Sequence, residues 1–390
     1  MISVDEARAH LAALVSTMPV ETVHLVDAAG RVLAEPVTAQ RDQPPFAAAS
    51  MDGYAIKAGE ANLHARFKVI GESAAGHGFC GRVEPGQAVR IFTGAPMPDG
   101  TDFVVIQEAV DRADPLICIT IDPKGTSNVR PAGGDFTVGA QIAAPRRLRP
   151  RDMALLAAMN IARVPVRRKP VVALIPTGDE LVMPGTNPGP DQITASNIFG
   201  LKAMLDDLGA TTRILPIARD SLRSLSTAFD LAAGADLIVT IGGASVGDHD
   251  LVATAAEGRG MHWSFYKVRM RPGKPLMAGR LGDAVLVGLP GNPVSAMVCG
   301  YVFLKPMIRL MLGLIHIEPP RCQARLSAPL RQNGPREHYM RAWLDADGLT
   351  AFDCQDSALL TVLADANALL IRPPDDPPRA AGTLVDYLPL

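Results

Sequence analysis

Apolar side chains recur at two different periods along the chain, and the elements they predict fall into separate regions. Residues 3–18 have the three- and four-residue spacing of an amphipathic helix, behind an S-x-x-E capping box formed by Ser3 and Glu6. A second helix is predicted at Asp152–Met159, where Asn160 follows as a left-handed cap. Together they predict a helical unit that is split in the sequence.

The segment between these two helices has a different pattern. Short apolar runs alternate with turns that contain Gly and Pro, which predicts β-strands at residues 66–70, 88–93, 103–108 and 116–121. The simplest interpretation is an all-β module inserted between the two parts of the helical unit.

From Lys169 onward, predicted strands and helices alternate. Strands are predicted at residues 171–175, 213–217, 236–241 and 284–288, and helices begin near Ser196, Ser221, His249 and Pro293. Short strands joined by helical connections are typical of an α/β domain with a doubly wound, mainly parallel sheet.

The last part of the chain returns to short alternating segments after Pro319 and Pro320, which predicts a small C-terminal β-barrel or sandwich, and we take it as a barrel. We therefore expect a multidomain α/β and β protein. Its predicted domains are a helical linker and dimerisation domain, an inserted β-rich domain, an α/β domain and the C-terminal barrel, at residues 1–40 with 143–168, 41–142, 169–315 and 316–390 respectively.

Composition narrows the class of protein. The 390 residues are enough for two to four domains, and 35 glycines with 33 prolines indicate many turns. The 38 basic and 40 acidic residues leave a net charge of −2, so nothing global attracts nucleic acid or an anionic membrane. The five scattered cysteines include no C-x-x-C pair, we expect no signal peptide, and no apolar run approaches the ~20 residues of a membrane span. We therefore expect a cytoplasmic protein.

Three loops follow predicted strands of the α/β domain and combine glycine with polar residues. They are PTGDE at 176–180, GGASVGDHD at 242–250 and GLPGNP at 288–293. Ligands of parallel sheets bind outside the carboxyl ends of the strands, and amides at helix N-termini favour a phosphate. The carboxylates in the same loops would repel a phosphate unless a hard cation such as Mg²⁺ lies between them. The loops predict a metal–phosphate site, although each by itself is also explained as a strand–helix turn with a capping acid.

A basic segment lies between the second and third of these loops. Lys267, Arg269 and Arg271 alternate along a predicted strand, which places them on one face, and Lys274 follows. Such a face would neutralise a phosphate ligand. A solvated edge strand that carries charges against aggregation explains the same pattern equally well.

Polar loops of the inserted module are further candidates for a site. They are SMDGY at 50–54, FTGAP at 92–96 and NVRPAGGD at 128–135, and ordinary turn chemistry also explains each of them. Common signatures of other enzyme classes are missing from the sequence, namely the P-loop, a G-x-G-x-x-G after the first sheet strand and the G-x-S-x-G elbow.

Taken together, these segments resemble the molybdopterin molybdotransferase family, often called MoeA, which includes the E domain of gephyrin. The resemblance covers essentially the whole chain. The motifs that carry it, in order, are PPFAAASMDGYA, RIFTGAPMPDGTDFVVIQE, NVRPAGGDF, PTGDELVMPG, GGASVGDHD, RPGKP and GLPGNPVSA.

The resemblance implies the final step of molybdenum cofactor synthesis. In that step, molybdenum from molybdate enters the dithiolene of adenylylated molybdopterin, and AMP is released with the help of Mg²⁺ or another divalent cation. The resemblance also implies an elongated homodimer, in which each active site joins the α/β domain of one subunit to the β-rich domain of the other. Molybdopterin adenylyltransferase and downstream cofactor-handling proteins are further partners that it suggests.

Functional residues are carried over by the resemblance and by the loop chemistry above. The predicted catalytic residues are Asp52, Thr93, Asp135, Glu180, Asp220 and Asp250, of which Glu180, Asp220 and Asp250 are expected to hold the cation and molybdate. The predicted cofactor-binding residues are Thr177, Gly178, Asp179, Gly242, Gly243, Ser245, Gly247, Lys267, Arg271, Lys274, Pro290, Asn292 and Pro293.

The sequence departs from the family pattern at a few positions. Gly134 stands where a glutamate commonly precedes the aspartate, and Arg271 replaces a lysine found in some members, which keeps the charge but changes the donor geometry. None of the principal acids is missing, which favours an active enzyme. The alternatives are a non-catalytic molybdopterin-binding or scaffold paralogue, and a nucleotide-sugar or phosphate-transfer enzyme that shares only the sheet architecture.

Overall fold

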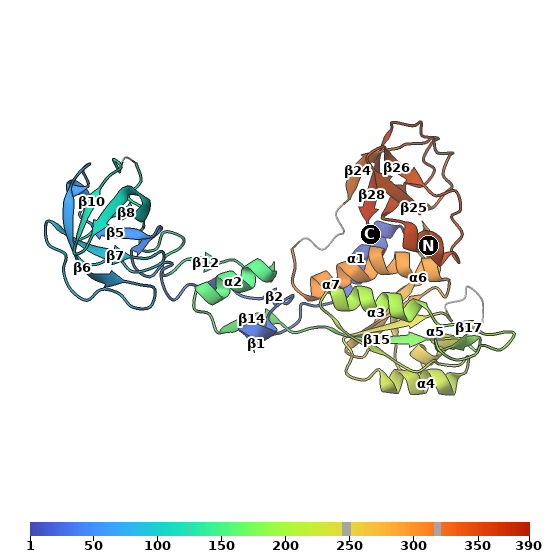
Figure 1. Cartoon of the computed structure of the whole chain (residues 1–390). Coiled ribbons are helices and arrows are strands. Elements are labelled where there is room, and N and C mark those ends of the chain that lie inside the picture. Colours follow the sequence, from blue (N-terminus) through green and yellow to red (C-terminus); the bar gives the residue numbers. More distant parts are fainter. Residues whose placement is uncertain (124, 244–250, 316–320) are drawn as a thin grey trace.

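The computed structural model describes residues 1–123, 125–243, 251–315 and 321–390. Figure 1 shows an elongated molecule, in which a β-rich body at one end is joined by a slender linker to a larger body at the other end. The larger body holds the α/β domain and the C-terminal β domain side by side. The predicted multidomain α/β and β architecture is therefore confirmed in outline.

The β-rich body is built on a mixed six-stranded sheet with the order β8-β5-β7-β6-β10-β9. Its apolar side chains, such as Ile56, Phe67 and Ile117, form a small core of their own. All four predicted strand regions are confirmed, as β6, β7, β8 and β10. The strands of the body are β4 (Ala48–Ala49), β5 (Gly53–Ile56), β6 (Arg66–Ser73), β7 (Gln87–Ile91), β8 (Phe103–Ile106), β9 (Val110–Ala113), β10 (Leu116–Ile119) and β11 (Val129–Arg130), with 3₁₀ turns at Ala58–Glu60 and Gln107–Ala109.

The linker contains more β-structure than its sequence predicts. The helix α2 (Pro150–Ala158) is confirmed, and Asn160 has the left-handed conformation expected of the cap, with φ 64°. A four-stranded sheet, β1-β14-β2-β13, accompanies α2, because strands from before and after the inserted module pair with each other. Local periodicity does not reveal such long-range pairing. The strands are β1 (Val20–His24), β2 (Val32–Leu33), β3 (Val37–Thr38), β12 (Gln141–Ile142), β13 (Arg146–Arg147) and β14 (Arg163–Arg167), with a 3₁₀ turn at Leu25–Asp27.

The first helix, α1 (Val4–Leu14), begins with the predicted capping box. The Glu6 N–H donates to Ser3 Oγ at 3.1 Å, and the Ser3 N–H donates to Glu6 Oε2 at 2.7 Å. The predicted division places residues 1–40 in the linker, whereas α1 packs on the α/β domain and its buried face joins that domain's core. The amphipathic pattern predicts a buried face but does not identify the surface that covers it.

The α/β domain has a six-stranded sheet with the order β18-β15-β19-β23-β22-β20. The first four strands are parallel and the last two are antiparallel, so the predicted mainly parallel sheet is confirmed. The central strands are buried along nearly their whole length, as the continuous apolar runs predict. The strands are β15 (Val171–Pro176), β18 (Thr211–Ile214), β19 (Leu237–Ile241), β20 (His262–Phe265), β22 (Met277–Leu281) and β23 (Ala284–Leu289), with a small pair of β16 (Leu181–Val182) and β17 (Ile193–Thr194).

Helices cover both faces of this sheet, as a doubly wound fold requires. One core is shared by α1 and by helices α3 (Asn197–Asp207), α6 (Pro293–Cys299) and α7 (Lys305–Met311), and a second core lies under α4 (Leu222–Leu231) and α5 (Leu251–Glu257). Figure 1 shows these two sets on opposite sides of the strands.

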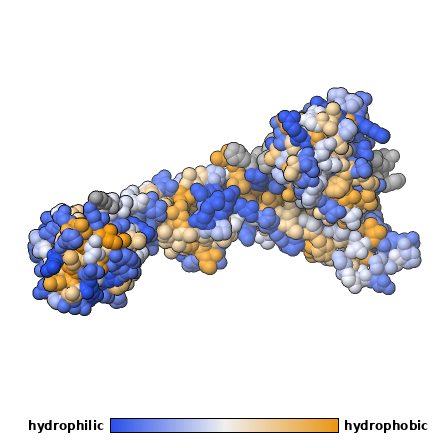
Figure 2. Space-filling view, turned by 45° about the horizontal axis from the view of Figure 1, so that its top comes forward, coloured by the Kyte–Doolittle hydropathy of each residue, from blue (hydrophilic) through white to orange (hydrophobic). Residues whose placement is uncertain are grey.

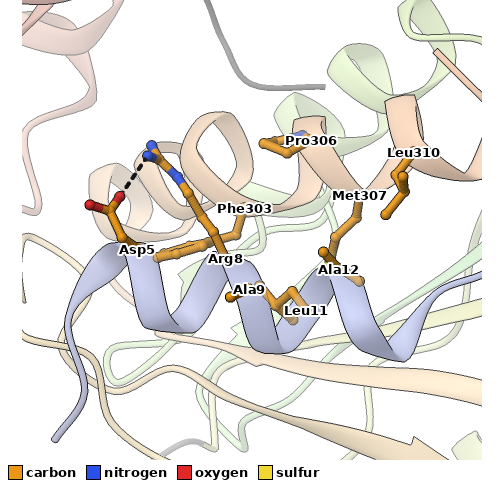
Figure 3. A pocket seen from close by; sticks show the side chains of 9 residues that line it. All are labelled: Asp5, Arg8, Ala9, Leu11, Ala12, Phe303, Pro306, Met307 and Leu310. Atoms are coloured by element: carbon orange, nitrogen blue, oxygen red, sulfur yellow. Dashed lines mark hydrogen bonds and ion pairs between the residues drawn. The ribbon is translucent and has the colours of Figure 1, made fainter. Parts of the chain in front are cut away.

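The predicted long helix after Pro293 is interrupted by a π-helical segment at Gly300–Leu304. Pro306 has no N–H to donate to the carbonyl of Val302, which its position in a regular helix would require. Arg8 of α1 supplies the missing donor, since its Nε lies 3.4 Å from Val302 O. Figure 3 shows Arg8 reaching from α1 toward this helix. Arg8 also contacts Asp5, which lies on α1 as well. Pro293–Met311 is long and apolar enough to span a membrane, but 72% of its most apolar window is buried, which is typical of a core helix.

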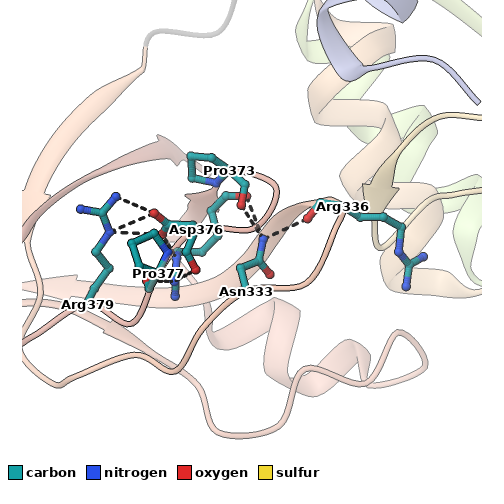
Figure 4. A network of polar contacts seen from close by, with 7 residues as sticks. Asn333, Arg336, Pro373, Asp376, Pro377 and Arg379 are labelled. Atoms are coloured by element: carbon teal, nitrogen blue, oxygen red, sulfur yellow. Dashed lines mark hydrogen bonds and ion pairs between the residues drawn. The ribbon is translucent and has the colours of Figure 1, made fainter.

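The C-terminal domain is one sheet with the order β21-β25-β27-β28-β24, in which β26 also pairs with β25. Its edge strand β21 comes from the α/β part of the chain, so this pairing ties the two domains together. A loop network supports the sheet: Asp376 pairs with Arg372 and Arg379, and the Asn333 amide donates to three backbone carbonyls (Figure 4). The elements are β21 (Met270–Arg271), β24 (Cys322–Arg325), β25 (Glu337–Asp345), β26 (Gly348–Ala351), α8 (Leu360–Asp365), β27 (Ala368–Arg372) and β28 (Leu384–Pro389).

Candidate functional site

A cavity of about 520 Å³ opens at the carboxyl ends of β15, β19 and β23. This is the edge of a parallel sheet at which ligands bind. Two of the three predicted loops meet there, since PTGDE contributes Thr177 and Glu180 and GLPGNP contributes Pro290 to Pro293. Residues from β17 and the start of α3 also line the cavity, together with Pro275 and Ala358.

The PTGDE loop is held in place by its neighbours on both sides. Thr177 is buried and its N–H donates to Ile241 O at 3.0 Å, while the Gly178 N–H donates to Ala218 O at 3.1 Å. The backbone of Asp179 is held by Arg219, whose Nη1 lies 2.8 Å from the Asp179 carbonyl.

The carboxylates of this loop differ in their surroundings. Asp179 Oδ1 accepts from the N–H of Asp220 at 3.1 Å, so Asp179 acts as a turn-capping acid. Glu180 lines the cavity. Glu180 is thus the carboxylate that the loop presents to a ligand.

The glycine loop after β19 passes very close to the backbone of the PTGDE loop. Gly242 has φ 99°, and a Cβ at this position would lie 2.4 Å from Thr177 O. The N–H of Gly242 donates to Leu289 O at 3.1 Å, which joins the ends of β19 and β23, as the bond from Thr177 to Ile241 joins those of β15 and β19. Gly243 follows in the left-handed region with φ 65°. The predicted residues Ser245, Gly247 and Asp250 lie outside the described residues.

The GLPGNP loop leads directly into α6. Pro290 is buried, and Pro293 occupies the first turn of α6, where its missing N–H costs nothing. Asn197 at the start of α3 donates from Nδ2 to Gly291 O at 2.7 Å. Asn292 donates from Nδ2 to Ser357 Oγ at 3.1 Å, which connects the loop to the C-terminal domain.

The predicted cation ligands are only partly brought together. Glu180 lines the cavity, Asp220 is exposed but is not part of its wall, and Asp250 lies outside the described residues. Within the described part of the chain, no three His, Cys, Asp or Glu side chains are grouped closely enough to hold a metal ion. Mg²⁺ is commonly held by one or two carboxylates together with substrate phosphates. The carboxylate of Glu180 therefore fits a cation that binds with its phosphate ligand.

The basic segment includes β21 but does not lie on a single strand. Only Met270 and Arg271 are in a strand, while Lys267 and Arg269 exchange backbone hydrogen bonds with Ile2. The alternation still holds, since Lys267, Arg269 and Arg271 are exposed and the residues between them are buried. Lys274 is exposed as well. None of these basic side chains forms the wall of the 520 Å³ cavity.

A second group of predicted residues lies in the β-rich body. Asp52 Oδ1 accepts two hydrogen bonds from Thr93, one from the backbone N–H and one from Oγ1, both at 2.8 Å. These bonds hold the pKa of Asp52 below its usual value, with a smaller contribution from the charge of Arg90. Asp52 is therefore ionised at neutral pH.

The backbone explains why this pair forms. Gly53 allows β8 to approach β5, since a Cβ there would lie 1.9 Å from Val105 O. The Gly94 N–H donates to Ala49 O at 2.9 Å, which brings the FTGAP loop against the segment before Asp52. Asp135 lies in the neighbouring loop, where its N–H donates to Gln43 O at 2.9 Å and its side chain is exposed.

Comparisons with known proteins agree along the whole length of the chain. Residues 2–160 match the MoeA N-terminal region (domain I and II), residues 173–310 a probable molybdopterin binding domain, and residues 323–390 the MoeA C-terminal region (domain IV). A molybdopterin molybdenumtransferase of Nostoc is 36% identical over 92% of this chain and 86% of its own length. The chain belongs to the molybdopterin molybdenumtransferase family. Relatives of that name in Haemophilus influenzae and Mycobacterium tuberculosis are 32% and 34% identical, over at least 98% of both chains.

Solved structures of the family have the same architecture. A molybdopterin biosynthesis MoeA protein from Pyrococcus horikoshii superposes with a TM-score of 0.85 at 28% identity, and covers 100% of this chain and 99% of its own. A second structure of a MoeA protein from the same organism gives a TM-score of 0.83 at 25% identity, with both chains covered completely.

In this member of the molybdopterin molybdenumtransferase family, a single chain keeps the two groups of site residues apart. Asp52 and Thr93 lie in the β-rich body, and Glu180 lies in the α/β domain, with the linker between them (Figure 1). The predicted catalytic residues thus lie in two separate groups within one chain, which we call half-sites.

Sequence reasoning missed residues that shape the cavity from the C-terminal domain. Arg341 is fully buried, and its Nη2 donates to the carbonyls of Cys354 and Asp356 at 3.3 and 2.9 Å. These bonds hold the turn from which Ser357 meets Asn292. An arginine within an alternating strand pattern is usually interpreted as surface, so no local signal identified it.

His338 lies on the same strand, three residues before Arg341. Burial, together with the smaller effect of the charges of Arg271 and Arg341, lowers its pKa to about 3. His338 is therefore neutral at physiological pH, which limits the positive charge buried between the two domains.

Proposed function

We propose that this chain inserts molybdenum from molybdate into the dithiolene of adenylylated molybdopterin, with release of AMP assisted by Mg²⁺ or another divalent cation. The cavity at the carboxyl edge of the parallel sheet carries the proposal. Its volume suits a ligand of several hundred Å³, and it combines a free carboxylate with loops that approach closely. Relatives that align over the full length carry the name molybdopterin molybdenumtransferase.

In and around the cavity, we assign different tasks to the chain's own residues. The Glu180 carboxylate would hold the cation, and a divalent cation would supply positive charge that neutralises phosphate and molybdate oxygens. Asp220 and Asp250 are further candidates to hold the cation, as the resemblance implies. Loop amides and the exposed Lys267, Arg271 and Lys274 receive the phosphate and pterin groups, as their charges favour.

We further propose that each complete site is formed by two subunits of a homodimer, with Asp52, Thr93 and Asp135 facing the cavity of the partner. The separation of the half-sites within one chain supports this arrangement. Apolar areas are visible on the β-rich body and the linker (Figure 2), and exposed apolar side chains there include Met51 (45% exposed), next to Asp52, and Val26 (83%). Such residues are suited to contacts between subunits.

We also propose a closed barrel for the C-terminal domain and a role for the linker in dimerisation. The bridge between Leu326 and Leu349 joins β24 to β26, which supports a closed C-terminal barrel. The linker would serve as the dimerisation domain. We place the enzyme in the cytoplasm, with molybdopterin adenylyltransferase as the supplier of its substrate.

One assay tests the proposed reaction. The protein is incubated with adenylylated molybdopterin, Mg²⁺ and molybdate, and AMP release and molybdenum incorporation are measured together. We expect both from the wild-type protein, a loss of roughly 100-fold for Glu180→Gln and little change for Asp191→Asn, an exposed acid outside the cavity wall. Ligand binding without AMP release would favour the scaffold alternative, and absence of binding would refute the proposal.

A further inference from the structure

Arg90 occupies an unusual position in the β-rich body. It lies on β7 directly opposite Tyr54 of β5, in the middle of the sheet that carries Asp52. Its guanidinium carbon is 5.1 Å from the ring centroid of Tyr54 and 4.8 Å from that of Phe92. An arginine held between two aromatic faces is fixed in orientation as well as in position.

The donors of Arg90 end on the segments that carry Asp52. Nη1 donates to the carbonyl of Gly53 at 3.2 Å, and Nη2 donates to Gln107 Oε1 at 2.6 Å. The backbone N–H of Gln107 in turn donates to the carbonyl of Asp52 at 3.1 Å. The two peptide units that flank Gly53 are therefore anchored by Arg90, one directly and the other through Gln107.

The Arg90 side chain also helps to fix the position of Thr93. Phe92, which stacks on the guanidinium, is the residue immediately before Thr93, and both Thr93 hydrogen bonds to Asp52 end on Oδ1. A shift of either segment would break these two bonds together. The second oxygen, Oδ2, takes no part in the contact with Thr93.

We infer that Arg90 is the positioning residue of the Asp52–Thr93 pair: its guanidinium, held between Tyr54 and Phe92, fixes the two loops so that the Asp52 carboxylate has one orientation. This inference rests on the proposed function, which gives Asp52 its role in the reaction. Lysine would not replace Arg90, because an ammonium on a flexible stem lacks the planar fork that reaches Gly53 and Gln107 while it stacks.

Kinetics on purified full-length variants test the inference. We expect Arg90→Met and Arg90→Lys to lower kcat for AMP release roughly 10- to 100-fold with a smaller change in KM, since misplacing a catalytic group by about 1 Å costs that much. Arg66→Met, on the exposed side of β6 in the same sheet, is the matched control and should keep the wild-type kcat. Full rescue by Arg90→Lys would show that only charge matters and would overturn the positioning role.

A readout without turnover separates this inference from the proposed reaction. The pKa of Asp52, followed by carboxyl NMR, should rise most in Thr93→Val, less in Arg90→Met and not at all in Arg66→Met. In an Asp52→Asn background, Arg90→Met should cost no further activity. If Asp52→Asn retains full activity while Asp52 still responds to Arg90→Met, the proposed function fails and the positioning inference stands. The positioning inference would be overturned by an unchanged Asp52 pKa in both Arg90 variants. It would also be overturned if the activity losses of Asp52→Asn and Arg90→Met were fully additive in the double variant. If Arg90→Met does not fold, the same measurements are made on Arg90→Lys.

Discussion

At the scale of single residues, the two carboxylates of the proposed reaction are prepared in different ways. Asp52 is bound twice by Thr93, so its ionised form is stabilised before any ligand arrives. Glu180 faces the cavity. The first arrangement fixes an orientation, and the second leaves the Glu180 carboxylate open to a ligand.

The pH dependence of Asp52 follows from these contacts. A carboxyl whose folded pKa is lowered contributes stability above its unfolded pKa, and this contribution is lost as the pH falls through the folded pKa. Thr93→Val removes the Oγ1 bond, so we expect the pKa of Asp52 to rise and the acidic limb of the activity profile to move to higher pH. Carboxyl NMR and rate–pH profiles measure both. Thr101→Val, which loses a bond to Pro98 O in the same body, should move neither.

At the scale of secondary-structure elements, the site depends on how closely strand ends and helices approach. Gly242 allows the end of β19 to lie against Thr177. Pro306 interrupts the long helix at the turn where Arg8 donates a hydrogen bond to the carbonyl of Val302. In both places one residue type is required by geometry rather than by chemistry.

Gly242→Ala tests the close approach. The new Cβ would meet a backbone oxygen at 2.4 Å in a left-handed conformation, so we expect a loss of about 1–3 kcal/mol in the free energy of unfolding and a distorted cavity with reduced AMP release. Gly234→Ala has a similar positive φ but open space around it, and it should cost less. Denaturant titration compares the two variants. Equal losses would show that backbone conformation, not the contact with Thr177, decides the effect.

Arg8→Met tests the repair of the helix break. The variant keeps the apolar stem but leaves the Val302 carbonyl without its donor, which should cost about 1–3 kcal/mol of unfolding free energy. Arg82→Met, at a side chain that is 69% exposed, should stay within about 0.5 kcal/mol of wild type. The denaturation midpoint is the measurement. A similar small change in both variants would mean that the π-helical segment needs no donor from α1.

At the scale of the whole molecule, the slender linker separates the two groups of predicted site residues within a single chain. It holds the β-rich body away from the α/β domain, so Asp52 and Glu180 belong to different half-sites (Figure 1). The proposed homodimer then joins the half-sites of different chains.

Mixing two inactive variants tests this arrangement. When Asp52→Asn and Glu180→Gln are co-expressed in equal amounts, about one quarter of the wild-type activity should return, because half of the dimers are mixed and each of these has one intact site. Asp52→Asn mixed with Asp52→Ala should restore nothing, since both changes damage the same half-site. If the first mixture also stays inactive although mixed dimers form, the site is not shared between subunits.

Much of the fold was predictable because it depends on local patterns. Apolar runs in the α/β region predict buried parallel strands, and the Ser3–Glu6 box and Asn160 mark helix ends that the structure confirms. The glycine and proline loops at the strand ends were predictable candidates for the same reason, since two of them meet at one cavity.

The rest was decided by contacts between distant parts of the chain, which local periodicity does not encode. The linker sheet pairs strands more than 100 residues apart, α1 packs on the α/β domain, and Arg341 reaches the cavity wall through the turn before Ser357. By itself, the sequence determined the motifs and loops that make these residues candidates for the chemistry, because motif and turn are local. Only the tertiary structure decided which of them meet within one chain, because that depends on how separately folded bodies are joined by the linker.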